Sequence, residues 1–86
     1  MVSENQVSKR IKGCIKDSSG EPIVGANVVE KGTTNGAITD IDGNFSIEVA
    51  TGAVLQISYI GYSTQDIRIT DKTSYNVVLK EDAEVL

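Results

Sequence analysis

The chain has 86 residues, 40% of them hydrophobic, and a formal net charge of −4, which fits one small folded domain. Without His and with a single Cys, it excludes histidine-based catalysis and an intramolecular disulfide. The eight basic residues do not form an extended cluster, and no segment approaches the roughly 20 apolar residues of a membrane helix, so neither nucleic-acid binding nor direct membrane insertion of this segment is expected.

The first 20 residues are predicted to form a polar N-terminal segment, a strand and a tight turn. Residues 1–10 are mostly polar, and we expect a disordered N-terminal segment there. A strand is predicted over 11–16, with Ile11 and Ile15 on one face. The segment 17–20 has Asp first and Gly fourth, which suits a type I turn, and Pro22 follows in a position before the next strand.

Six further short strands are predicted from alternating apolar residues, over 25–31, 37–40, 44–49, 54–60, 63–70 and 75–80. The residues predicted to face inward are Ala26, Val28, Phe45, Ile47, Val49, Leu55, Ile57, Tyr59, Ile67, Ile69, Val77 and Leu79. Residues 81–86 carry three acids and resemble an exit linker, which leaves 11–80 as the folded domain.

Seven strands at spacings of about ten residues, with no helical period, predict an all-β fold, namely an antiparallel β-sandwich. A small closed barrel is the alternative that spacing alone leaves open. The segments 15–20 and 38–43 resemble each other, and shared Asp-x-x-Gly turn chemistry explains this better than duplication. Gly43 is expected to need a positive φ, so Gly43→Val should cost more stability than Gly13→Ala, because Gly13 lies in a strand, where the change mainly alters entropy and packing.

None of the residues predicts a catalytic, cofactor-binding or metal-binding site. Asp40 and Asp42 are better explained as a turn, because Gly43 follows them directly. As a calcium loop this stretch has its glycine at the fourth position, whereas an EF-hand needs it at the sixth. Cys14 is interpreted as a small strand residue that shares its face with two lysines, with no base beside it. The chain is therefore not expected to be an enzyme or to need a cofactor.

Tyr59 and Tyr62 flank Gly61 and allow two interpretations. They could form an exposed stacking platform for a sugar or a peptide. Alternatively, Tyr59 completes an inward row and Tyr62 packs at a corner, which we prefer.

Several motifs in this order resemble one known family. They are Ile11-Lys12-Gly13; Asp17 with Gly20-Glu21-Pro22-Ile23 and Gly25-Ala26-Asn27-Val28; Lys31-Gly32-Thr33-Thr34-Asn35-Gly36; Thr39-Asp40-Ile41-Asp42-Gly43-Asn44-Phe45; and Ser58-Tyr59-Ile60-Gly61-Tyr62-Ser63-Thr64-Gln65. Over about residues 11–82 the chain resembles the carboxypeptidase-regulatory-like domain that precedes the plug of SusC/RagA-type TonB-dependent outer-membrane transporters of Bacteroidetes. Glu30 departs from this pattern, because the family often has an apolar residue there, and this puts the inward assignment at the end of the second strand in doubt.

The resemblance implies a seven-stranded, transthyretin/prealbumin-like sandwich with Greek-key, Ig-like topology. It also implies an excised periplasmic domain of a longer outer-membrane protein that imports glycans or peptides. The domain would be a non-enzymatic interaction or spacer module that meets the TonB system or its own plug and barrel, with the nutrient bound elsewhere in the parent. The alternatives are a carbohydrate- or peptide-binding module of a secreted hydrolase or adhesin, and a regulatory appendage of a peptidase.

Overall fold

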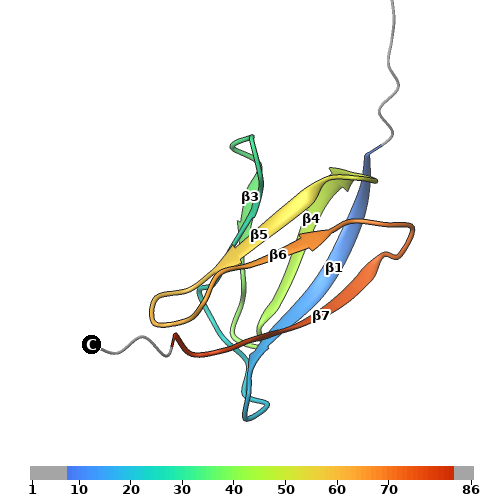
Figure 1. Ribbon diagram of the computed structural model, residues 1–86. Coiled ribbons are helices and arrows are strands. Elements are labelled where there is room, and N and C mark those ends of the chain that lie inside the picture. The colour runs from blue at the N-terminus through green and yellow to red at the C-terminus, as the bar shows by residue number, and fades with distance from the viewer. Residues whose placement is uncertain (1–7, 83–86) are drawn as a thin grey trace, which may run out of the picture.

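The computed structural model describes residues 8–82, and this part of the chain is all β. Its seven strands are β1 (Ser8–Asp17), β2 (Asn27–Glu30), β3 (Gly36–Ile38), β4 (Asn44–Ala50), β5 (Val54–Ser58), β6 (Gln65–Arg68) and β7 (Ser74–Leu79). They form a three-stranded sheet in the order β4-β1-β7 and a four-stranded sheet in the order β3-β2-β5-β6 (Figure 1). The prediction of a seven-stranded β-sandwich, as opposed to a closed barrel, is confirmed.

The chain changes sheet four times, between β1 and β2, β3 and β4, β4 and β5, and β6 and β7. All ladders are antiparallel except that between β1 and β7, which is parallel and pairs Gly13 with Tyr75. An antiparallel arrangement was expected throughout. A parallel pair cannot be joined by a tight turn, and here it joins the first and the last strand of the chain. No turn motif in the sequence therefore predicts it.

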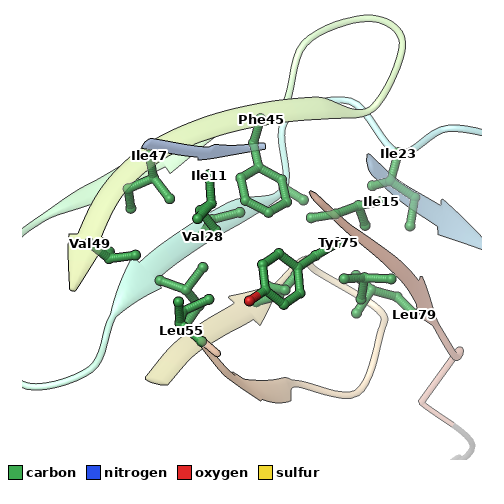
Figure 2. Close-up of a cluster of buried hydrophobic side chains, with 14 residues drawn as sticks. Ile11, Ile15, Ile23, Val28, Phe45, Ile47, Val49, Leu55, Tyr75 and Leu79 are labelled. Atoms are coloured by element: carbon green, nitrogen blue, oxygen red, sulfur yellow. The ribbon is translucent and has the colours of Figure 1, made fainter. Parts of the chain in front are cut away.

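The core lies between the two sheets and follows the strict alternation of apolar residues. In β4 the pattern is cleanest, because Phe45, Ile47 and Val49 are buried while Ser46 and Glu48 are exposed. Figure 2 shows these side chains meeting residues of the other strands between the two layers. The buried cluster consists of Ile11, Ile15, Ile23, Ala26, Val28, Phe45, Ile47, Val49, Leu55, Ile57, Ile69, Tyr75, Val77 and Leu79. Tyr59 and Ile67, which were predicted to face inward, are only partly buried and pack against this cluster from its border.

The structure corrects the expected borders of the domain. Strand β1 starts at Ser8, so residues 8–10 are paired with β4 and are not part of a disordered segment. At the other end, Glu81 forms an isolated antiparallel bridge with Tyr62, and the N–H of Asp82 donates to the carbonyl of Gly61. The exit segment therefore begins while the chain is still hydrogen-bonded to the domain. The remainder of both predicted terminal segments, 1–7 and 83–86, lies outside the described residues.

The packing around Gly13 leaves no room for a side chain. A Cβ at this position would overlap the ring of Phe45 and would stand 2.8 Å from the carbonyl oxygen of Tyr75. Gly13 is buried in the middle of β1, between its partners on β4 and β7. The absence of a side chain there is what lets the Phe45 ring approach the main chain of β1.

Candidate functional site

Two Asp-x-x-Gly turns have the same construction. In the first, Asp17 Oδ1 accepts hydrogen bonds from the N–H groups of Ser19 and Glu21, both at 2.9 Å, and from the Ser19 hydroxyl at 2.8 Å. In the second, Asp40 Oδ1 accepts from the N–H groups of Asp42 and Asn44, both at 2.9 Å. Each turn closes on a glycine, and the φ of Gly43 is 78°. The interpretation of Asp40 and Asp42 as turn residues is confirmed, and so is the positive φ of Gly43.

Hydrogen bonds within the first turn lower the pKa of the Asp17 carboxyl group. The N–H of Glu21 and then the hydroxyl of Ser19 hold the pKa of Asp17 below its ordinary value of 3.8, because both donors stabilise the carboxylate. The Asp17 carboxylate thus accepts its hydrogen bonds from groups of its own turn. It has a structural use in the turn, which accounts for its position without any catalytic role.

Groups that could bind a metal do not gather in the described part of the chain. Among residues 8–82, no three His, Cys, Asp or Glu side chains lie close enough together to hold an ion. Cys14 is half-buried, and its Sγ lies 3.7 Å from the carbonyl oxygen of Asp42. Lys12 and Lys16 are exposed on the same face of β1, as the sequence predicted.

The tyrosine pair packs against the protein at the corner between β5 and β6. The ring centroids of Tyr59 and Tyr62 are 5.8 Å apart, with the planes inclined at 45°. Both rings are partly buried and pack against the core cluster. Burial, and then the negative charges of Asp17 and Glu81, raise the pKa of Tyr62. This arrangement supports the corner interpretation over an exposed stacking platform.

An open depression of about 500 Å³ lies on the side of the sandwich where β3 and β4 are the edge strands. Its lining residues are Lys12, Gly13, Ala37, Ile38, Asp40, Asn44, Phe45 and Ser46. Apolar surface comes from Ala37, Ile38 and Phe45, and Ile38 is 65% exposed. The opposite side of the sandwich is more closed, because the N–H of Ser63 donates to the carbonyl of Lys80, and the Gln65 side chain donates to the carbonyl of Val78.

The edge of β4 that faces away from β1, called the β4 edge below, is partly capped. In the β1–β4 ladder the Ile15 N–H bonds the Gly43 carbonyl, so the main-chain groups of Asn44, Ser46 and Glu48 point to the β4 edge. Asp40 satisfies both main-chain groups of Asn44, and the Asn35 amide donates to the Glu48 carbonyl at 2.9 Å. Between these caps the main chain of Ser46 stays open to solvent.

Cations gather on the outer face of the three-stranded sheet. Arg10, Lys12 and Lys16 project from β1 on this face, which we call the basic face. Among the outward residues of β1, β4 and β7, Glu48 is the one acid. The only ion pair within residues 8–82 is Lys31–Asp66, at 3.0 Å, on the other sheet. A positive area therefore borders the β4 edge, and Glu48, the cross-strand neighbour of Arg10, forms no ion pair with it.

Sequence reasoning missed three features of this region: the Asn35 cap on the β4 edge, the depression and the role of Thr39. Thr39 is buried, its hydroxyl donates to the Ile23 carbonyl at 2.6 Å, and it accepts from the Ala26 N–H at 2.8 Å. Asn35 also donates to Glu30, which is half-buried at the end of β2, so the doubtful inward position is occupied by a hydrogen-bonded carboxylate. None of these roles has a local sequence signal, because each depends on residues from another strand or loop.

No helix that could cross a membrane occurs in residues 8–82.

Comparison with known sequences identifies the relatives of the chain. Residues 11–86 match the family described as the CarboxypepD_reg-like domain. The chain is 49% identical over 76 residues to the TonB-dependent receptor SusC of Bacteroides thetaiotaomicron, with 88% of this chain and 7% of the receptor covered. It is 38% identical over 86 residues to a TonB-dependent receptor of Formosa agariphila, with 99% of this chain and 8% of the receptor covered. The chain thus spans less than a tenth of the length of these relatives.

Solved structures agree with the sandwich. A chain in a crystal structure of a type II Cohesin-X-Dockerin complex of Acetivibrio cellulolyticus superposes with a TM-score of 0.67 and 26% identity, covering 90% of this chain and 60% of that one. A second mutant of that complex gives a TM-score of 0.64.

Proposed function

Since the chain belongs to the CarboxypepD_reg-like domain family, we propose that it is a non-enzymatic interaction or spacer domain of a TonB-dependent outer-membrane importer of glycans or peptides. The observation that carries this proposal is the coverage of the relatives. TonB-dependent receptors match nearly the whole chain, yet it accounts for only 7% and 8% of their length. A domain of that size serves a much larger protein, and we place it on the periplasmic face of the outer membrane.

A non-enzymatic role is supported by the chemistry of the side chains. General acid–base or nucleophilic catalysis needs a reactive group oriented by a second group. The chain has no His, and the one Cys is half-buried beside a main-chain carbonyl. The carboxylates of Asp17 and Asp40 accept hydrogen bonds from their own turns. These assignments leave no candidate pair of catalytic groups in residues 8–82.

Docking to protein partners is the role that the surface supports. The candidate partners are the TonB system and the plug or barrel of the same receptor, and the nutrient is bound elsewhere in that receptor. The depression is open to solvent and has one aromatic lining residue, Phe45, whereas small-molecule sites are enclosed. An edge strand with open main-chain groups instead suits contact with another polypeptide.

Deletion of the domain from its parent receptor tests this proposal. Cells carrying the receptor with and without residues 11–80 would be compared for nutrient binding at the cell surface and for growth on that nutrient, at matched receptor levels. We expect surface binding to be retained while uptake and growth fall. Loss of surface binding at a normal receptor level would contradict the proposal and favour a carbohydrate- or peptide-binding module.

A further inference from the structure

We propose that the β4 edge at Ser46 accepts an extended segment of a protein partner in which an acidic residue stands between two apolar residues. The segment adds as a strand to the three-stranded sheet. Its acidic side chain lies on the basic face, and its apolar neighbours lie over the depression toward β3. This inference rests on the proposed docking function and specifies where the partner binds and what chemistry it presents.

The first support is the direction of the main chain at the β4 edge. The Ser46 N–H and C=O point away from β1, as do those of Asn44 and Glu48. Asp40 caps Asn44 on one side and Asn35 caps the Glu48 carbonyl on the other. The open stretch between these caps, the N–H and C=O of Ser46 and the N–H of Glu48, can pair with a short strand. The caps confine the register to the neighbourhood of Ser46.

The second support is the apolar surface on the inner side of this edge. A strand residue opposite Ser46 points to the outer face, so the residues before and after it point inward. On that side they meet the depression, where Ala37, Ile38 and Phe45 line the gap between the two edge strands. Ile38 is 65% exposed, and burying it against an apolar residue of the partner removes apolar surface from water. The inward positions of the added strand therefore favour apolar residues.

The third support is the charge around Ser46 on the outer face. The Arg10 guanidinium donates to the Ser46 hydroxyl at 3.0 Å, and Lys12 is the cross-strand partner of Ser46. Glu48 lies opposite Arg10 on this face, but no carboxylate of residues 8–82 forms an ion pair with Arg10 or Lys12. Strands are spaced about 4.7–4.9 Å apart, so an acidic side chain opposite Ser46 meets the guanidinium beside that serine and lies two strands from Lys12. A basic residue of the partner at the same place would be repelled by Arg10 and Lys12. The positive charge around Ser46 therefore favours a partner with an acidic residue there.

The test uses the 86-residue chain with ¹⁵N labelling and a short capped peptide containing Ile-Glu-Ile within a Thr- and Ser-rich background. We expect the peptide to shift the amide signals of Ser46 and Glu48, with the signals of β6 unchanged. A peptide with Ile-Lys-Ile, and one N-methylated within the central segment, are the controls and should bind at least several-fold more weakly. If the Ile-Glu-Ile peptide leaves Ser46 and Glu48 unchanged, or if the lysine peptide binds equally well, the inference is wrong.

Matched variants separate the two chemical supports. Lys12→Glu reverses a charge two strands from the acidic side chain and should weaken binding of the Ile-Glu-Ile peptide about two- to threefold. Lys72→Glu makes the same charge change in the β6–β7 loop and should not weaken it. Ile38→Ser should weaken binding, whereas Ile41→Ser, which changes a 78% exposed isoleucine that does not line the depression, should not. Equal effects within either pair would overturn the proposal. So would Ser46 and Glu48 shifts that follow protein concentration without peptide, because the occupant is then a second copy.

The two proposals fail differently. If the inference alone is wrong, deletion of residues 11–80 still impairs uptake while Lys12→Glu in the full receptor leaves uptake normal and the peptide does not bind. If the docking function itself is wrong, deletion removes surface binding or has no effect on uptake, whatever the peptide does.

Discussion

The aromatic ring of Phe45 on β4 lies against the main chain of Gly13, its partner on β1. The ring occupies the place where any other residue at position 13 would have its Cβ. Phe45 is the one Phe of the chain and is part of the buried cluster between the two sheets, as Figure 2 shows. The packing of the three-stranded sheet thus depends on a missing side chain, and this gives the first prediction.

We expect Gly13→Ala to lower the free energy of unfolding by about 1–3 kcal/mol, the usual cost of overpacking a core. Urea unfolding checks it. Phe45→Leu is also destabilising, but the double variant should be less destabilised than the sum of the single variants, because leucine leaves room for the added methyl group. Additive costs would show that the ring and position 13 are energetically independent.

Gly43→Val should be more destabilising than Gly52→Val. Both glycines have a positive φ, 78° and 97°, so both substitutions introduce backbone strain of about 1–3 kcal/mol. A Cβ at Gly43 would also stand 2.5 Å from the Ile15 carbonyl oxygen, whereas nothing lies within 4 Å at Gly52. Because it combines strain with overlap, Gly43→Val is also expected to cost more than Gly13→Ala. Equal denaturation midpoints at positions 43 and 52 would rule out the overlap with β1.

Thr39→Val is expected to destabilise the fold by about 1–3 kcal/mol, although the two side chains have similar shapes. The substitution removes the hydroxyl that bonds the Ile23 carbonyl and the Ala26 N–H, and it leaves both groups buried without that partner. Thr39→Ser keeps the hydroxyl and is the matched control. The prediction fails if valine is tolerated better than serine in chemical denaturation.

Asp17 should make stability depend on pH in the acid range. Its pKa in the folded state lies below the ordinary value of 3.8, so its carboxylate contributes stability that is complete above that value. The contribution is lost as the pH falls through the lower, folded pKa. The stability difference between the wild type and Asp17→Asn should therefore be larger at about pH 7 than at about pH 2.5.

The control for Asp17 is Asp71→Asn, a substitution of an exposed acid in the segment between β6 and β7. Its side chain forms none of the hydrogen bonds of residues 8–82, so the substitution removes no turn contact of the kind that Asp17 makes. If the two variants show the same pH profile, the hydrogen bonds from Glu21 and Ser19 do not set the behaviour of Asp17.

Calcium should not change the thermal stability. The oxygen of Asp40 that faces its loop already accepts two main-chain hydrogen bonds, and no other two acids join it in residues 8–82. Melting curves recorded with calcium and with a chelator should give the same Tm. A separation of many degrees between the two curves would reveal a site that the turn geometry does not provide.

Elements that depend on neighbouring residues can be predicted from the amino-acid sequence. The alternation in β4 specifies its buried face, because side chains in a strand point to opposite sides with a period of two. The two Asp-x-x-Gly segments specify their turns, because an Asp side chain and a following glycine complete the hydrogen bonds and φ of the loop within a few residues. Repetition of these local signals favoured a sandwich, and the strand pairing excluded the alternative of a small closed barrel.

The identity of neighbouring strands, and the groups that their edges expose, follow from the packing of the whole chain. The parallel pairing of β1 with β7, the contact of Phe45 with Gly13 and the cap from Asn35 to Glu48 all join residues distant in sequence. The open main chain at Ser46 is likewise a consequence of β4 having a partner on one side only. The alternation of apolar residues predicts which face of a strand points inward. It does not predict which strand lies beside it, because strand pairing depends on the packing of the whole chain.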